Sequence, residues 1–539
     1  MTAAVLTPSV PFTGTRALLR FAARRDRRRL LIWVLALAGV IVYATTALGA
    51  VYPTAASRQA RAAVMETPAG ILLSGPGYGT SDYTLGAMIA NELGFSVMIA
   101  VAIMSIQFVV RHTRAEEEDG GAELVLAGSV GRRAPLTTAL VLVALANLAV
   151  AVVVPAGLVA AGLPAVDSVA LAIGWALTGL VFGAVAAVTA QLFEQARGAT
   201  GAALAVLGAA AVVRGVGDVL HPRGSALSWV SPIAWAQQTR PYVDLRWTPL
   251  LLAVALIAVL VAAAYRISRH RDVGAGLLVP RRGPANASAL LTGPTALLAR
   301  LQRGTLIGWT AALVLLGATF GSLTRSVINM VEQNELLARA FAAAGGNITD
   351  SFTSATSVEF GLCAAAFAVA SVLRVRAEES AGRAELMLAA PLHRRRLLGG
   401  ALVVTSGGAL LLLLAAGLAD GLTAAAVSGD PDLVLRDLSA ALVHLPAVLV
   451  VVGITALLVG AVPRLAGLAW LVIVWALVAG MFGQLLGFPG WALKLSPFGW
   501  TPKVPAETAD VGSLVGLLVV AIALVAAALA AFRARDVPA

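Results

Sequence analysis

Two short acidic segments hold the densest groups of side chains that could take part in chemistry. The first reads RAEEEDGGAEL at residues 114–124, and the second reads RAEESAGRAEL at residues 376–386. Eight of the eleven aligned positions are identical, at an offset of 262 residues. Carboxylates can accept charge-assisted hydrogen bonds from basic groups, either within the chain or on a partner protein. We refer to these ranges as the first and second acidic segments.

No enzyme or metal motif accompanies these carboxylates. A P-loop requires a lysine followed by Ser or Thr, whereas the two lysines, Lys494 and Lys503, precede Leu and Val. The five histidines are scattered, and the sequence contains no HExxH motif, no pair of cysteines and no GxSxG motif. We therefore expect no ATPase or other enzyme activity, no metal site and no cofactor in this chain.

The elements that must position the acidic segments are membrane-spanning helices. The chain is 59% hydrophobic and only 12% charged, against about 25% charged residues in soluble domains. Its apolar runs repeatedly reach about 18 residues, the length that spans a bilayer as a helix. We predict an all-α polytopic membrane protein with about twelve spans. They lie near residues 30–51, 87–110, 136–161, 168–190, 199–220, 248–265, 304–323, 357–373, 397–419, 437–461, 465–486 and 511–532.

The duplication extends well beyond the acidic segments. Arg132–Arg133 returns as Arg394–Arg395 at offset 262, and Arg271–Asp272 returns as Arg535–Asp536 at offset 264. Six spans is an even number, so both halves have the same orientation and form parallel repeats. The predicted organisation is an N-terminal cytoplasmic segment, a first six-helix half, a cytoplasmic linker and a second six-helix half, at residues 1–29, 30–268, 269–303 and 304–539.

Basic residues predict the orientation in the membrane. With the N-terminus inside, the segments on the cytoplasmic side hold 28 of the 39 Lys and Arg residues, as the positive-inside rule requires. Both termini are then cytoplasmic, in the cell membrane. The net charge of +11 is explained by anionic lipid rather than nucleic acid. Residues 1–29 form either an amphipathic helix on the inner leaflet or a disordered basic tail.

In both halves the acidic segment lies on the cytoplasmic side, between the second and third spans. Gly120 and Gly382 should interrupt the helix there. An anionic inner leaflet repels carboxylates, so lipid does not explain these segments, whereas basic groups of a protein partner would. The alternative is a solvated loop whose glutamates pair with arginines of the same loop.

The order of these features resembles the cytoplasmic loop of ABC-2 type permeases. The fused six-span halves and the Ser-Pro motif before the last span of each half resemble the actinobacterial exporters of polyketide antibiotics, of the tetronasin type. The resemblance implies that each acidic segment forms a coupling helix on an ATPase subunit. Some of the glutamates could instead pair with Arg114 or Arg376 and hold the shape of the loop. The residues concerned are Arg114, Glu116, Glu117, Gly120, Glu123, Leu124, Arg376, Glu378, Glu379, Gly382, Glu385 and Leu386.

Other candidates lie at the predicted outer side. Glu92 and Glu359 open the second span of each half, and each could line an exit path or be an interfacial carboxylate stabilised by the helix dipole. The Ser-Pro motifs are Ser231–Pro232 and Ser496–Pro497. They could anchor nearby tryptophans at the interface or, as the resemblance implies, form re-entrant helices that close an outer gate.

The best-supported function is the membrane subunit of an ATP-binding cassette exporter. Its hydrophobic or amphipathic, antibiotic-like substrate would move outward. Two copies of a separate ATPase would bind ATP and Mg²⁺. The alternatives are an ion-gradient-driven secondary transporter, for which the chain has few carboxylates in mid-span, and a polytopic membrane enzyme, for which the external segments contain no recognisable catalytic group.

Overall fold

The structure is a computed structural model that describes residues 11–66, 68–221, 223–278, 283, 285–289, 291, 293–332, 348–380, 382, 389, 393–482 and 488–535. Helices are the only regular secondary structure in these ranges. Twelve helical stretches among them are long and apolar enough to cross a membrane, and they correspond one to one to the predicted spans. The prediction of an all-α polytopic membrane protein is confirmed.

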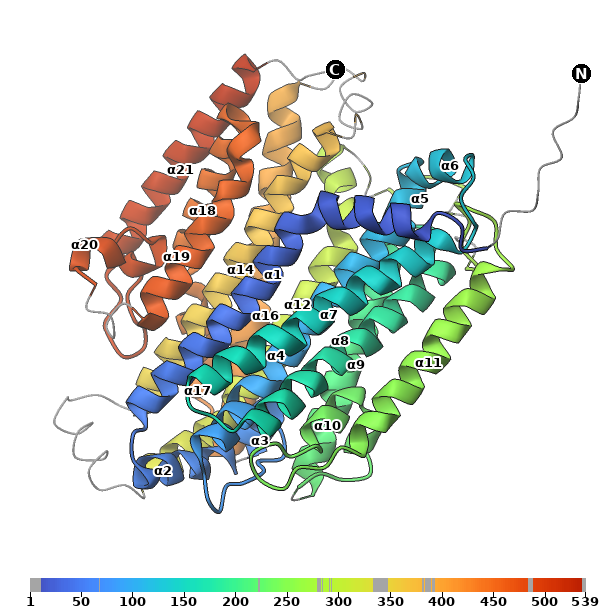
Figure 1. Cartoon of the computed structure of the whole chain (residues 1–539). Helices are drawn as coiled ribbons and strands as arrows, with labels where there is room; N and C mark the ends of the chain where they lie inside the picture. Colours follow the sequence, from blue (N-terminus) through green and yellow to red (C-terminus); the bar gives the residue numbers. More distant parts are fainter. Residues whose placement is uncertain are drawn as a thin grey trace, which may run out of the picture. The chain divides into compact units, whose positions relative to one another are not determined.

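The described chain divides into two compact units, Met1–Gly283 and Pro284–Ala539 (Figure 1). The helices of the first unit are α1 (Thr15–Val51), α2 (Ala55–Met65), α3 (Pro68–Ser74), α4 (Leu85–Val110), η1 (Arg111–Ala115), α5 (Glu116–Glu118), α6 (Gly121–Leu126), α7 (Ala134–Ala160), α8 (Ala165–Leu192), α9 (Ala196–Leu220), η2 (Ser228–Val230), α10 (Pro232–Gln237) and α11 (Pro249–Ser268). Those of the second are α12 (Pro294–Glu332), α14 (Ile348–Ser380), α16 (Arg394–Ser428), α17 (Leu433–Leu442), α18 (Leu445–Ala461), η3 (Pro463–Leu468), α19 (Ala469–Phe482), α20 (Gly490–Leu493), η4 (Pro497–Trp500) and α21 (Val511–Ala534).

The two units repeat one pattern of helix packing. In the first unit, α1 packs on α7, and α8 packs on both α4 and α11. In the second unit, α12 packs on α16, and α18 packs on both α14 and α21. The first and third spans are therefore neighbours in each unit, and the fourth span contacts the second and the sixth. This pattern places the end of the sixth span beside the fourth span in both units.

The helices extend beyond the predicted edges of the spans. The first predicted span begins at residue 30, whereas α1 begins at Thr15. No Gly or Pro lies between Thr15 and residue 30, so nothing in this basic stretch stops the helix. In Figure 1 the beginning of α1 runs across one end of the first unit before the helix turns along the bundle. Residues 15–29 are thus helical and continuous with the first span.

Small residues allow α8 to lie at the centre of the first unit. Gly179 is buried, and a Cβ atom at this position would clash with the side chains of Asn147 and Val101. Asn147 is fully buried and donates a hydrogen bond to the Ser105 hydroxyl over 2.9 Å. Small residues and buried amide groups are the usual means of close helix contact in membranes, where no hydrophobic force drives association.

Gly179→Ala should therefore destabilise the first unit. The added methyl group overfills the contact between α8, α7 and α4, which costs about 1–3 kcal/mol in packed cores. A lower midpoint of thermal unfolding in detergent would report this loss. Gly39→Ala is the matched control, because Gly39 is exposed and has no atom within 4 Å of the added Cβ. Equal midpoints for the two variants would contradict close packing at Gly179.

The first acidic segment and the first Ser-Pro motif lie at opposite ends of the first unit. Figure 1 shows α5 and α6 at one end, together with the beginning of α1, and α2, α3 and α10 at the other. The Ser-Pro motif immediately precedes and begins α10. This separation agrees with the two sides of the membrane predicted for them.

Candidate functional site

The first acidic segment continues directly from the second span. Helix α4 passes into a π-helical turn, Arg111–Ala115, and then into α5. The helix stops at Gly120, whose φ of 75° lies in the left-handed region that glycine adopts most easily. The short helix α6 then begins at Gly121. The break predicted from the glycines is present, and it separates α6 from the end of the span.

Arg114 anchors the first acidic segment inside the protein. Its side chain is completely buried, and it donates hydrogen bonds to three backbone carbonyls. These belong to Ala190 at 2.8 and 3.0 Å, Gly274 at 3.2 Å and Ala275 at 3.0 Å. A buried guanidinium is tolerated only when its donors and its charge are satisfied. Arg114 therefore joins the end of the second span to the fourth span and to the chain after the sixth.

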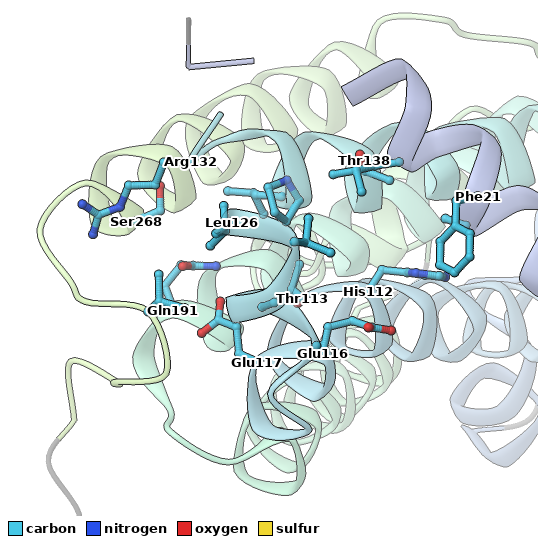
Figure 2. Close-up of a pocket in the computed structure, with 18 of the residues that line it drawn as sticks. Phe21, His112, Thr113, Glu116, Glu117, Leu126, Arg132, Thr138, Gln191 and Ser268 are labelled. Carbon is cyan, nitrogen blue, oxygen red and sulfur yellow. The ribbon is translucent and has the colours of Figure 1, made fainter. Parts of the chain in front are cut away.

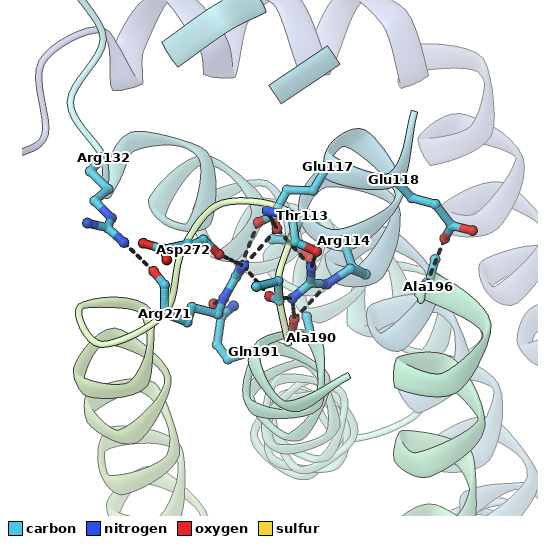
Figure 3. Close-up of polar contacts among 12 residues, drawn as sticks. Thr113, Arg114, Glu117, Glu118, Arg132, Ala190, Gln191, Ala196, Arg271 and Asp272 are labelled. Carbon is cyan, nitrogen blue, oxygen red and sulfur yellow. Dashed lines mark hydrogen bonds and ion pairs between the residues drawn. The ribbon is translucent and has the colours of Figure 1, made fainter. Parts of the chain in front are cut away.

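Glu117 points into the same contact, as Figure 3 shows. Its two carboxylate oxygens accept hydrogen bonds from the Arg271 guanidinium over 2.6 and 2.8 Å. Oε2 also accepts the Gly274 backbone N–H at 3.2 Å, and Arg114 Nη1 lies 3.0 Å from the same oxygen. A bidentate ion pair, in which two N–H groups of one arginine bond both oxygens of a carboxylate, is a strong and directional interaction. We call the pair Glu117 and Arg271 the first clamp.

The neighbouring carboxylates are also bound within the first unit. Glu116 forms an ion pair with Arg25 of α1. Glu118 accepts the backbone N–H of Ala196 at 2.8 Å, in the first turn of α9, where the positive end of the helix dipole favours a carboxylate. Three consecutive glutamates thus tie this segment to three different parts of the unit.

Helix α6 has an inward and an outward face. On the inward side Ala122 is buried, and Val125 and Leu126 line a cavity that reaches the beginning of α1 (Figure 2). On the outward side Glu123 is exposed, and 81% of the Leu124 surface is open to the surroundings. A carboxylate and a large apolar side chain are therefore presented together on a helix whose other face is packed.

The second acidic segment is described only in part. Glu385 and Leu386 lie outside the described residues. Helix α14 runs to Ser380, and Gly382 has a φ of 70°, so the helix ends at the position that corresponds to Gly120. Glu378 lies 3.7 Å from Arg374, one helical turn away. The predicted interruption of the helix is therefore present in both segments.

Glu379 repeats the arrangement of Glu117. Its side chain is 1% exposed, and its two oxygens accept hydrogen bonds from Arg535 Nη2 at 2.6 and 2.7 Å. Arg376 lies 3.7 Å away and is 31% exposed, so it is held much less firmly than Arg114. We call the pair Glu379 and Arg535 the second clamp.

A further arginine completes each clamp. Arg132, just before α7, donates to the backbone carbonyl of Arg271. Arg394, at the start of α16, donates to the carbonyl of Arg535 at 2.6 Å. The sequence shows that Arg132 recurs as Arg394 and Arg271 as Arg535, but it does not show that Arg271 and Arg535 contact the glutamates. Their shared offsets of 262 and 264 residues were the available signal.

The predicted coupling glutamates thus fall into two groups. Glu116, Glu117 and Glu379 are paired with arginines of their own unit, and pairing with Arg114 and Arg376, expected for some glutamates, occurs for Glu117 and Glu379. Glu123 is exposed beside Leu124. A sequence motif treats these residues alike, whereas the structure gives them different surroundings.

The two carboxylates predicted to lie at the outer side, Glu92 and Glu359, are not equivalent. Glu92 accepts hydrogen bonds from Arg61 of α2 at 3.1 and 3.0 Å. Burial has the largest single effect and lowers the pKa of Arg61, but the hydrogen bonds to Glu92 and the charge attraction of Glu92 and two tyrosines together outweigh it, so the net pKa is raised. Glu359 is half-buried and has no hydrogen bond or ion pair with the residues that the structure describes. Of the two, only Glu92 has an ionic partner among the described residues.

The Ser-Pro motifs begin short helices. Ser231 is buried, and its hydroxyl accepts the Ile233 N–H at 3.3 Å and donates to the Ala210 carbonyl at 2.7 Å. In the second unit, the Ser496 hydroxyl accepts the Phe498 N–H at 3.2 Å. Serine is a favoured N-cap residue, and proline is favoured in the first helical turn. The motif therefore has a local structural role in both units.

A tryptophan closes each of these turns. The indole N–H of Trp235 donates to the Trp229 carbonyl at 2.7 Å, and that of Trp500 donates to the Lys494 carbonyl at 2.8 Å. Each bond spans six residues across the Ser-Pro pair. The repeated spacing of Ser, Pro and Trp thus produces the same local turn in both units.

No group of three or more His, Cys, Asp or Glu side chains suited to a metal ion occurs among the residues that the structure describes. The fold and the site define a multi-pass integral membrane protein with two six-span units. In each unit a glutamate of the acidic segment is paired with an arginine of the same unit.

Comparison with known proteins then gives the family. The family model described as "Multidrug efflux system permease Rv1217c, C-terminal domain" matches residues 16–269 and 291–533. The chain is 40% identical over 537 residues to "Multidrug efflux system permease protein Rv1217c" of Mycobacterium tuberculosis, covering 98% of this chain and 96% of that protein. This chain belongs to that family of permeases.

Proposed function

We propose that this chain is the membrane subunit of an ATP-driven exporter of the ABC-2 type, with the ATPase on a separate polypeptide. The observation that carries the proposal is the outward face of α6, where Glu123 lies beside the 81% exposed Leu124. Protein interfaces commonly combine an apolar anchor with charged groups around it. The glutamates before α6 hold this face in place, which suits a contact that must transmit movement.

The substrate class and the assembly complete the proposal. The relative is called a multidrug efflux permease, and this supports a hydrophobic or amphipathic drug-like substrate, including antibiotics of the polyketide type. The protein lies in the cell membrane with both termini in the cytoplasm. Two acidic segments in one chain call for two ATPase copies, which bind ATP and Mg²⁺.

We expect a complex of one permease with two ATPases. The experiment is co-expression with an ATPase encoded beside the permease gene, followed by purification and native mass measurement around the 54.8 kDa permease. The permease purified alone should show no ATP turnover, because it has no P-loop. Two permease chains in each active complex would contradict this stoichiometry.

Loss of the permease should raise sensitivity to hydrophobic antibiotics. A cell without the exporter retains more of such compounds, so both growth inhibition and cellular retention should increase across a panel of them. Re-expression of the wild-type chain should restore the original values. Unchanged susceptibility and retention for every compound would contradict drug export.

An ion-gradient-driven transporter is the second candidate, and two buried carboxylates favour it. Asp420 is 3% exposed and Asp437 is 2% exposed, both within candidate spans of the second unit. Carboxylates inside spans often mark ion or proton pathways. In reconstituted vesicles, transport that stops when the ion gradient is collapsed, and continues without ATP, would support this candidate over the first.

A further inference from the structure

We infer that the two clamps attach the sixth span of each unit to its acidic segment, so that these two elements move together during transport. Glu117 and Arg271 in the first unit, and Glu379 and Arg535 in the second, are then positioning residues for energy coupling. This inference rests on the proposed function. It adds a specific route by which force applied at the acidic segment reaches a span far away in the sequence.

The covalent chain alone does not provide this route. The first acidic segment continues from the second span and leads into the third, so both spans follow its movement directly. The sixth span ends at Ser268, shortly before Arg271. Arg271 lies 154 residues after Glu117 in the sequence. The two-pronged ion pair over 2.6 and 2.8 Å gives the end of that span its own attachment.

The clamps are built to resist separation. Arg271 is also held by the Gln191 side chain at 2.7 Å, and Glu117 also receives the Gly274 N–H. In the second unit, Arg535 Nη1 donates to the Val459 carbonyl at 3.2 Å. A carboxylate with several charge-assisted hydrogen bonds is far more restrained than one in an exposed ion pair. Movement of the segment without the arginine would leave buried charges unpaired.

Duplication separates this arrangement from an ordinary surface ion pair. Glutamate, its arginine partner and the arginine that holds the partner's carbonyl recur together in both units. The flanking residues differ, because Glu118–Asp119 of the first segment is replaced by Ser380–Ala381 in the second. The clamp is therefore retained where the surrounding acidic residues are not, as expected for a part that both units use.

The test replaces the glutamate or the arginine of a clamp with glutamine, which removes the charge and keeps a polar side chain. The variants are Glu117→Gln, Arg271→Gln and the double variant, with Glu379→Gln and Arg535→Gln for the second clamp. The complex with its ATPase is reconstituted in vesicles, and the drug transported per ATP hydrolysed is measured. We expect a drop of about tenfold in each single variant, the loss typical of one charge-assisted contact. The double variant of one clamp should fall no further than its singles, because they break the same contact.

A structural readout accompanies the transport assay. Amide hydrogen exchange in residues 121–126 and 266–276 should slow together when ATP binding traps the wild-type complex. In Glu117→Gln the slowing should remain in residues 121–126 and disappear from residues 266–276. This result would show that the two elements have been disconnected, which a general loss of stability would not produce.

Asp119→Asn is the control, because Asp119 is exposed and its carboxylate has no partner among the described residues. It removes one carboxylate charge near Glu117 but leaves the first clamp intact, so transport per ATP should stay at the wild-type value. Clamp variants that bind the ATPase and transport normally per ATP would overturn the inference. A wild-type chain that binds no ATPase would instead overturn the proposed function, so the two failures are distinguishable.

Discussion

Glu123→Lys should weaken binding of the ATPase by roughly tenfold to a hundredfold, which corresponds to the loss of one charge-assisted hydrogen bond at about 1.5–3 kcal/mol. Glu123 is exposed on α6, and its side chain has no hydrogen bond or ion pair with the residues that the structure describes, so the variant should still fold and reach the membrane. Drug transport should fall with ATPase binding. Affinity of the purified permease for its ATPase, measured in detergent, checks the result directly.

Asp119→Lys is the matched control for this prediction. It makes the same charge change in the same segment, but outside α6. If it weakens ATPase binding as much as Glu123→Lys, the effect is general electrostatics rather than a contact made by α6. Glu385→Lys tests the corresponding position of the second acidic segment, and the double variant should transport less than either single variant. Normal export by the double variant would contradict the coupling role of both segments.

Arg114→Met should cause the largest loss of stability among single changes in the acidic segments. The buried guanidinium donates to three backbone carbonyls and contacts Glu117. Its removal takes this donor from the Ala190 and Gly274 carbonyls and leaves the Ala275 carbonyl and Glu117 with Arg271 alone. Breaking one side of a buried ion pair costs about 3–5 kcal/mol. We expect a large fall in the midpoint of thermal unfolding and less folded protein in the membrane, measured by fluorescence-detected size exclusion.

Arg376→Met is the corresponding change in the second unit, and it should have little effect. Arg376 is 31% exposed and lies 3.7 Å from Glu379, a contact that resembles an exposed ion pair. Such pairs contribute about 0–1 kcal/mol, and Arg535 still holds Glu379 in the variant. Equal losses for Arg114→Met and Arg376→Met would show that the surroundings of the two arginines do not differ in the way described.

Much of the fold could be predicted because membrane spans are a local property of the chain. An apolar run of about 18 residues must be helical in a bilayer, since the backbone has no water to bond with. Each of the twelve predicted spans is therefore found as a helix. Helix ends were predicted less well, as α1 shows, because hydropathy marks where a span leaves the bilayer and not where the helix ends.

The candidate site was only partly predictable. The sequence places the acidic segments between the second and third spans and marks Gly120 and Gly382 as breaks. It does not distinguish Glu117 from Glu123, because both are glutamates of one repeated motif. Their roles depend on the direction of each side chain around a helical turn and on partners that are not nearby in the sequence.

By itself, then, the sequence determined that this protein is a helical membrane protein of twelve spans built by duplication, because apolar length and repeated residues can be read along one chain. Only the tertiary structure decided which carboxylates of the first acidic segment are paired with a basic side chain of the described chain. Arg25 and Arg271 reach Glu116 and Glu117 from positions 91 and 154 residues away in the sequence, whereas no basic side chain reaches Glu123 among the described residues. Such pairings follow from how the helices pack, and packing is a property of the folded unit rather than of any segment within it.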